Sequence, residues 1–219
     1  METETVTQVI ERTLASVSPN TLPSQQSSER NPTTTSQVAV TLQSRYGSRQ
    51  QFLDTFHIDK QMKYTVNADR CYFGTAPTMG MVNEAYGNKT AQEWLTAQLA
   101  DLSEFSGARD KITARQIKQL ADIIADDYHW LKVTEIMLFF RKFKRGEYGK
   151  FYGAVDPLTI TTALREFQRD RNTAYARHEQ EEREAKEAED RRRWLEWRQR
   201  MALEAKGDQK GQKEKEQNE

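Results

Sequence analysis

An apolar stripe over residues 134–143 places the strongest constraint on how this chain can fold. Four large apolar residues recur there at i, i+3, i+4 and i+7: Ile136, Phe139, Phe140 and Phe143. This spacing puts their side chains on one face of an α-helix, and that face has to be buried against other elements. Gly146 follows where a left-handed residue commonly ends a helix. The chain is therefore expected to build its core around this helix.

Three further helices are predicted from their start signals. These signals are two capping boxes and one Asp-Pro start: Thr90 with Glu93, Thr113 with Gln116, and Asp156 with Pro157. Apolar stripes follow each signal, so the expected fold is a small all-α domain of about residues 37–175. The expected core consists of Leu95, Leu99, Ile117, Leu120, Ile124, Ile136, Phe139, Phe140, Leu164 and Phe167.

The two ends of the chain have a different composition from this domain. Residues 1–36 predict a short amphipathic helix followed by a disordered linker that is rich in proline and serine. Residues 37–65 give weaker signals, with a faint helix pattern over 49–56 and a brief apolar alternation at Val38, Val40 and Leu42 that is too short to establish a strand. Residues 176–219 predict a charged, solvated helix and a disordered tail.

Three connections within the domain leave structural alternatives open. The glycine-bearing run 71–87 lacks the Gly-Lys-Ser/Thr of a phosphate loop, so a turn at Gly74 and a short helix ending at Gly87 are expected instead. The connection 126–131 is compatible with an αα-hairpin or a helix-turn-helix. The sequence GEYGKFYGAVDP, residues 146–157, predicts either a short hairpin or a tight irregular loop.

Composition argues against several classes of function. The 33 basic and 33 acidic residues balance, so overall charge gives no indication of a nucleic-acid partner. The single cysteine, Cys71, and three scattered histidines form neither an internal disulfide nor a metal-ligand or nucleophile–base spacing. Asp122, Asp126 and Asp127 are expected to form a solvated acidic face. We therefore expect a non-enzymatic, cytoplasmic protein with no cofactor, no metal and no membrane segment.

One local cluster of positive charge points towards nucleic acid. Residues 141–150 contain five cations and one anion, a local charge of +4, and Tyr148, Phe151 and Tyr152 are interleaved with them or follow directly. Cations contact phosphates and exposed rings stack on bases, so DNA is one expected partner. The expected contact residues are Arg141, Lys142, Lys144, Arg145, Tyr148, Lys150, Tyr152, Arg165 and Arg169. The competing interpretation is that the aromatics belong to the core and the cations only end and solubilise the helix.

Two tryptophans in the charged C-terminal segment suggest a second kind of surface. Trp194 and Trp197 occur in an otherwise polar helix that lacks a sustained heptad repeat. Such residues either fold back onto the domain or anchor a protein partner. A protein–protein adaptor or structural protein that uses these two residues is therefore the alternative function.

The motif EIMLFF at 135–140, followed by GEYGKFYGAVDP and an arginine-bearing helix, resembles uncharacterised helical proteins of bacterial phages and integrated mobile elements. The resemblance is clearest over residues 113–171. It implies a genomic setting rather than an activity, and this helical build is loosely similar to that of phage replication accessory proteins such as helicase loaders. The chain lacks an ATP-binding motif, which argues against a loader of the ATPase type. The expected function is that of a non-enzymatic accessory protein of a mobile element that acts in DNA replication.

Overall fold

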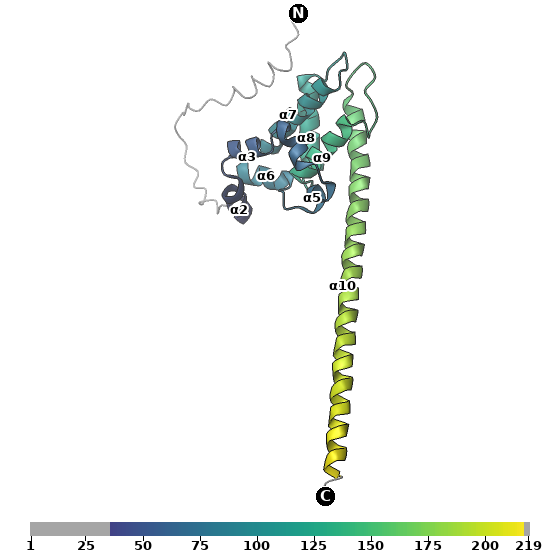
Figure 1. Cartoon of the computed structure of the whole chain (residues 1–219). Coiled ribbons are helices and arrows are strands. Elements are labelled where there is room, and N and C mark those ends of the chain that lie inside the picture. Colours follow the sequence, from purple (N-terminus) through teal and green to yellow (C-terminus); the bar gives the residue numbers. More distant parts are fainter. Residues whose placement is uncertain (1–35, 217–219) are drawn as a thin grey trace, which may run out of the picture. The chain divides into compact units, whose positions relative to one another are not determined.

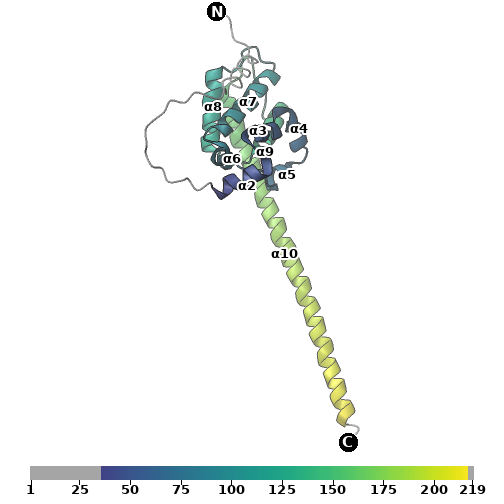
Figure 2. The same cartoon turned by 90° about the vertical axis from the view of Figure 1, so that its left-hand side faces the viewer.

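The computed structural model describes the backbone of residues 36–216 and side chains as far as residue 202. It contains helices α2 (Gln37–Tyr46), α3 (Arg49–Thr55), η1 (Ile58–Lys60, a 3-10 turn), α4 (Gln61–Tyr64), α5 (Ala68–Phe73), α6 (Met79–Tyr86), α7 (Thr90–Phe105), α8 (Ala114–Asp127), α9 (Val133–Lys144) and α10 (Pro157–Glu216). The predicted all-α fold is confirmed (Figures 1 and 2). The helix and linker expected over residues 1–35 lie outside the described residues.

Residue contacts divide the chain into two units. The first ends at Arg169 and the second begins at Asp170, so α10 contributes to both. Among the described residues, all the buried apolar ones lie in the first unit, including every member of the predicted core. The described part of the second unit, residues 170–216, is helix alone, and its residues 179–202 are exposed throughout.

Helix α9 lies at the centre of the first unit, as its apolar stripe predicts. Ile136, Phe139 and Phe140 have no exposed surface. The Phe139 ring meets Phe167 edge to face, with 5.7 Å between the ring centroids, which joins α9 to the first turns of α10. The helix ends at Gly146, whose φ of 80° is left-handed and whose N–H donates to the Phe143 carbonyl at 2.9 Å.

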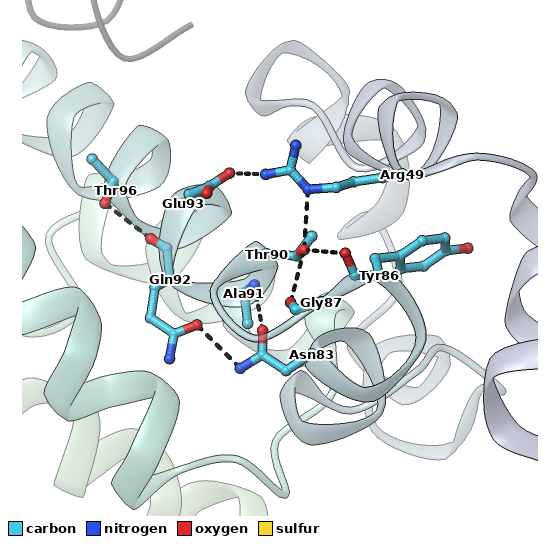
Figure 3. Close-up of polar contacts among 9 residues, drawn as sticks. All are labelled: Arg49, Asn83, Tyr86, Gly87, Thr90, Ala91, Gln92, Glu93 and Thr96. Carbon is cyan, nitrogen blue, oxygen red and sulfur yellow. Dashed lines mark hydrogen bonds and ion pairs between the residues drawn. The ribbon is translucent and has the colours of Figure 1, made fainter. Parts of the chain in front are cut away.

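Helix α7 begins differently from the capping box that its sequence predicts. Thr90 is the first helical residue rather than the cap, and its hydroxyl donates to the carbonyls of Tyr86 and Gly87 (Figure 3). The N–H of Ala91 instead donates to the Asn83 side chain of α6 at 2.8 Å. The Arg49 guanidinium donates to the Thr90 hydroxyl and pairs with the other predicted box residue, Glu93. The start of α7 is therefore capped by Asn83 of α6, while Arg49 of α3 binds the two residues of the predicted box.

The other two start signals are confirmed. Thr113 and Gln116 form a reciprocal capping box at the start of α8. Asp156 accepts the N–H of Leu158 at 2.9 Å at the start of α10. Both caps use side chains within three residues of the helix start, which explains why the local sequence was sufficient to find them.

Two early helices form where the sequence gives the weakest signals. The brief alternation at Val38, Val40 and Leu42 belongs to α2, in which Leu42 is buried with Ala39 against Ala85 of α6. Helix α3 has a capping box of its own, because the side chains of Ser48 and Gln51 each accept a backbone N–H of the other residue. The Ser48–Gln51 box is a local signal that is present in the sequence but was not predicted from it.

The run 71–87 forms a helical connection and not a phosphate loop. Gly74 ends α5, and α6 starts with the Thr78 hydroxyl accepting the N–H of Met81 and stops at Gly87. The first two N–H groups of α6 donate to carbonyls in the α8–α9 connection, those of Leu131 at 2.9 Å and His129 at 2.8 Å. These two hydrogen bonds fix the α8–α9 connection to α6. Helix α8 itself packs mainly against α7.

The loop 146–156 is irregular, so of the two alternatives the hairpin is wrong. It pairs with the loop before α8 instead of with itself. The N–H of Asp110 donates to the Gly153 carbonyl at 3.0 Å, and the N–H of Val155 donates to the Asp110 carbonyl at 2.9 Å. Two hydrogen bonds to a segment about 40 residues earlier therefore fix the loop between α9 and α10.

Candidate functional site

Two cations of the predicted nucleic-acid cluster are directed towards neighbouring helices. The Lys144 ammonium pairs with the Asp101 carboxylate of α7 and donates to the Gln61 side chain of α4 at 3.3 Å. Only 17% of the Lys144 side chain is exposed. The Arg141 guanidinium donates to the Thr65 hydroxyl at 3.1 Å. These two side chains link α9 to its neighbours, which fits a structural role better than the expected contact with phosphate.

The other two cations at the end of α9 share one carboxylate. Lys142 lies 3.4 Å and Arg145 lies 3.5 Å from the oxygens of Glu147. Arg145 is nevertheless 65% exposed, and exposed ion pairs contribute little to stability. Each of the four helix cations thus has a protein partner, and Arg145 is the most accessible of them.

The aromatic residues of the loop divide between the core and the surface. Tyr148 is half-buried, and its ring centroid lies 5.8 Å from that of Phe139. Phe151 stacks on Phe143 at 5.1 Å between centroids. Tyr152, in contrast, is 91% exposed. The expected role of Tyr148 in stacking on bases stays a prediction; its ring packs on α9 and is less accessible than that of Tyr152.

The remaining residues of the predicted surface are exposed, but carboxylates lie among them. Lys150, Arg165 and Arg169 all lie at the surface. Glu147 and Glu166 are exposed in the same stretch of the chain. The accessible part of the predicted nucleic-acid surface is thus smaller and less positive than the local charge of +4 suggests.

The two C-terminal tryptophans are exposed. Trp194 is 52% and Trp197 51% exposed, and Met201 is 43% exposed. These three residues recur at i, i+3 and i+7, so they share one side of α10, which we call the Trp face. The Arg198 guanidinium lies over the Trp194 ring, 5.4 Å from its centroid. Large apolar side chains on an otherwise charged helix are typical of a protein contact.

Cys71 does not have the properties of a nucleophile. It is fully buried and its thiol donates to the Tyr64 carbonyl at 3.3 Å. Burial, followed by the nearby Glu135 carboxylate, raises the pKa of the thiol to about 11. A nucleophilic cysteine needs the thiolate form, which this environment disfavours at neutral pH.

The described residues form neither a metal-binding group nor a membrane-spanning helix. Between Ser36 and Ala202, the histidine, cysteine and carboxylate side chains nowhere gather in a group of three that could hold a metal ion. Across the described helices, none is both long and apolar enough to cross a membrane.

One family model matches part of the chain. Residues 111–210 match a family of unknown function, DUF6633. The matched range starts just before α8, includes α9 and the basic cluster, and continues along α10 beyond the Trp face, whereas α2–α7 lie outside it. No curated protein and no solved structure matches the chain.

Proposed function

We propose that this is a non-enzymatic accessory protein whose α10 helix binds a protein partner through the Trp face. The observation that carries the proposal is the exposure of two tryptophans and a methionine at helical spacing on a helix that is otherwise charged. Tryptophan is enriched among the residues that dominate binding energy at protein interfaces. The family match supports a shared role for this segment, because it extends along α10 past Met201. The resemblance to proteins of phages and mobile elements supplies the proposed setting.

The experiment compares three versions of the full chain as immobilised baits in an extract of the source cells. These are the wild type, a Trp194→Ala/Trp197→Ala double variant, and a Leu158→Ala control. Leu158 is 72% exposed on the same helix but lies outside the Trp face. We expect a protein retained by the wild type and by the control, and reduced at least about tenfold by the double variant, since two interface tryptophans contribute ~2 kcal/mol or more each. Identical retention by all three baits would contradict the proposal.

A nucleic-acid surface is the second candidate, supported by Tyr152, whose ring is 91% exposed beside the exposed Lys150. A single-stranded nucleic acid could stack a base on this ring and place phosphates near the cations that remain accessible. Arg165 and Arg169, on the first turns of α10, extend this smaller surface. DNA replication remains the process proposed for it.

The nucleic-acid candidate is tested by its dependence on salt. Changing Lys150, Arg165 and Arg169 to Gln should reduce the slope of log affinity against log salt by roughly three phosphate contacts. Tyr152→Ala should weaken single-strand binding by about 1–3 kcal/mol per stacked base and leave the slope unchanged. Lys118→Gln, an exposed cation on α8, is the matched control. A wild-type chain without salt-dependent binding at low ionic strength would eliminate this candidate.

A further inference from the structure

The second unit has an uneven distribution of charge that the Trp face does not explain. Residues 179–190, the acidic block, contain seven carboxylates and two cations, a net charge of −5. Residues 191–200, the basic block, contain five arginines and one glutamate, a net charge of +4. Every residue of both blocks is exposed. Two blocks of opposite sign and similar size therefore follow one another along a single exposed helix.

Contacts within the helix leave most of this charge separation in place. Glu179 pairs with Arg183 at 3.5 Å, Glu181 pairs with Arg177 at 3.7 Å, and Asp190 pairs with Arg193 across the block boundary. Glu181, Glu184 and Glu187, however, follow one another at i, i+3, where like charges repel. A positively charged surface packed along the acidic block would offset this repulsion, and a negatively charged surface would do the same for the basic block.

Each block matches the other block of the same helix in length and is opposite to it in charge, so a second copy of the helix offers the complementary surface. At 1.5 Å per residue the acidic block is about 18 Å long and the basic block about 15 Å. Two copies of α10 placed antiparallel bring each acidic block against the other copy's basic block, so both contacts form at once. A parallel pair would place like charges together along its whole length. Charge complementarity thus favours a second copy of the helix as the partner and an antiparallel orientation of the pair.

We propose that residues 179–200 pair antiparallel with the same residues of a second copy of this chain, acidic block against basic block. The proposal rests on the proposed function, because it names the protein partner of α10. Trp194 and Trp197 of the Trp face lie inside the basic block and are covered by the same pairing, with their rings against the aliphatic stems of the long charged side chains opposite. The two-fold axis crosses the pair near Asp190.

The first test measures the mass of the full chain by sedimentation equilibrium. The wild type should be a dimer at low ionic strength, and its dissociation constant should rise at least about tenfold when 0.5 M NaCl shortens the screening length to ~4 Å. An acidic-block variant changes four Glu residues to Lys: Glu181, Glu182, Glu184 and Glu187. A basic-block variant changes four Arg residues to Glu: Arg191, Arg192, Arg198 and Arg200. Each variant alone should be monomeric, and an equimolar mixture should form a heterodimer.

The second test measures direction by disulfide cross-linking. Asp190→Cys places a thiol near the two-fold axis, so the two copies should cross-link. Arg183→Cys is the matched control, seven residues away on the same side of the helix. In an antiparallel pair its two thiols lie about 22 Å apart along the helix axis and should not react, whereas in a parallel pair both variants would cross-link. The buried Cys71 thiol is shielded under these conditions.

The outcomes separate this inference from the proposed function. A monomeric wild type, dimers that persist in both charge variants, or cross-linking at residue 183 would each overturn antiparallel self-pairing. A monomeric wild type whose Trp194→Ala/Trp197→Ala variant still loses a captured protein would leave the proposed function standing. A dimer that the charge variants abolish and the tryptophan variant leaves unchanged would uphold self-pairing and contradict the role of the Trp face.

Discussion

The first turns of α10 and the stretch beyond Asp170 belong to one helix but depend on different interactions. Up to Arg169, the helix buries Ile160, Leu164 and Phe167, each at most 1% exposed, in the core of the first unit. From residue 179 to residue 202 every residue is exposed, and i, i+4 ion pairs and good helix formers support the backbone. The comparison shows that one continuous helix can be held by buried apolar contacts in one part and by contacts between neighbouring charged side chains in another.

The largest expected effect tests this contrast on a single helix. Phe167→Ala, like Phe139→Ala or Phe140→Ala on α9, should lower the free energy of unfolding by about 3–5 kcal/mol, because each ring is fully buried. In dilute protein, where the chain is monomeric, Trp194→Ala should change it by less than about 0.5 kcal/mol, as is usual for exposed positions. Urea denaturation followed by far-UV circular dichroism measures both. If Trp194→Ala cost as much as Phe167→Ala, the exposed state of the Trp face would be wrong.

A smaller effect is expected at the end of α9. Gly146 has a φ of 80°, and an added Cβ would meet no atom within 4 Å, so the cost of Gly146→Ala is conformational alone. We expect a loss of about 1–2 kcal/mol of unfolding free energy. Gly146→Asn should recover part of this loss, since asparagine tolerates the left-handed region better. Equal losses for the alanine and asparagine variants would point to a steric cause instead.

High salt should have a smaller effect, which distinguishes the exposed part of α10 from the buried helix α9. Each exposed i, i+4 pair, such as Arg177–Glu181 or Glu179–Arg183, contributes about 0.3–0.5 kcal/mol and is screened at high ionic strength. In dilute protein, 1 M NaCl should speed amide hydrogen exchange over residues 177–200 by up to a few-fold and leave α9 unchanged. Faster exchange in α9 would show that ion pairs, and not burial alone, hold the first unit.

A pH-dependent effect is expected on the alkaline side of the stability profile. Burial raises the pKa of the Cys71 thiol to about 11, so the folded state favours the protonated form. This contribution to stability is fully present below the thiol pKa of the unfolded chain, about 8.5, and is lost as pH rises through the folded value. Unfolding free energies measured between pH 8 and 11 should therefore fall more steeply for the wild type than for Cys71→Ser. Identical slopes would mean that the thiol is not shielded.

Prediction from sequence succeeded where the signal was local. The stripe at Ile136, Phe139 and Phe140, the capping box at Thr113 and the N-cap at Asp156 all depend on residues within one or two helical turns. The same reasoning failed for Thr90, because the side chain that caps α7 is Asn83 of another helix. The pattern of a capping box was present, but a tertiary contact replaced it.

In the candidate site, too, the sequence predicted local features and missed tertiary contacts. Composition correctly identified a cluster of cations and aromatics, and spacing correctly grouped Trp194 with Trp197 on one side of a helix. The sequence could not show that Lys144 pairs with Asp101, or that the Tyr148 ring packs on Phe139. A charged or aromatic residue looks the same in the sequence whether it contacts a ligand or another part of its own protein.

The sequence by itself determined the all-α class, the core face of each main helix and the charge blocks of α10, because periodicity, capping and charge order are properties of neighbouring residues. Only the tertiary structure decided which cations and rings are accessible. Lys144 lies 43 residues from its carboxylate partner, and Arg141 lies 76 residues from Thr65. Contacts over such separations depend on how helices pack against one another, and packing is set by the whole core rather than by any one segment.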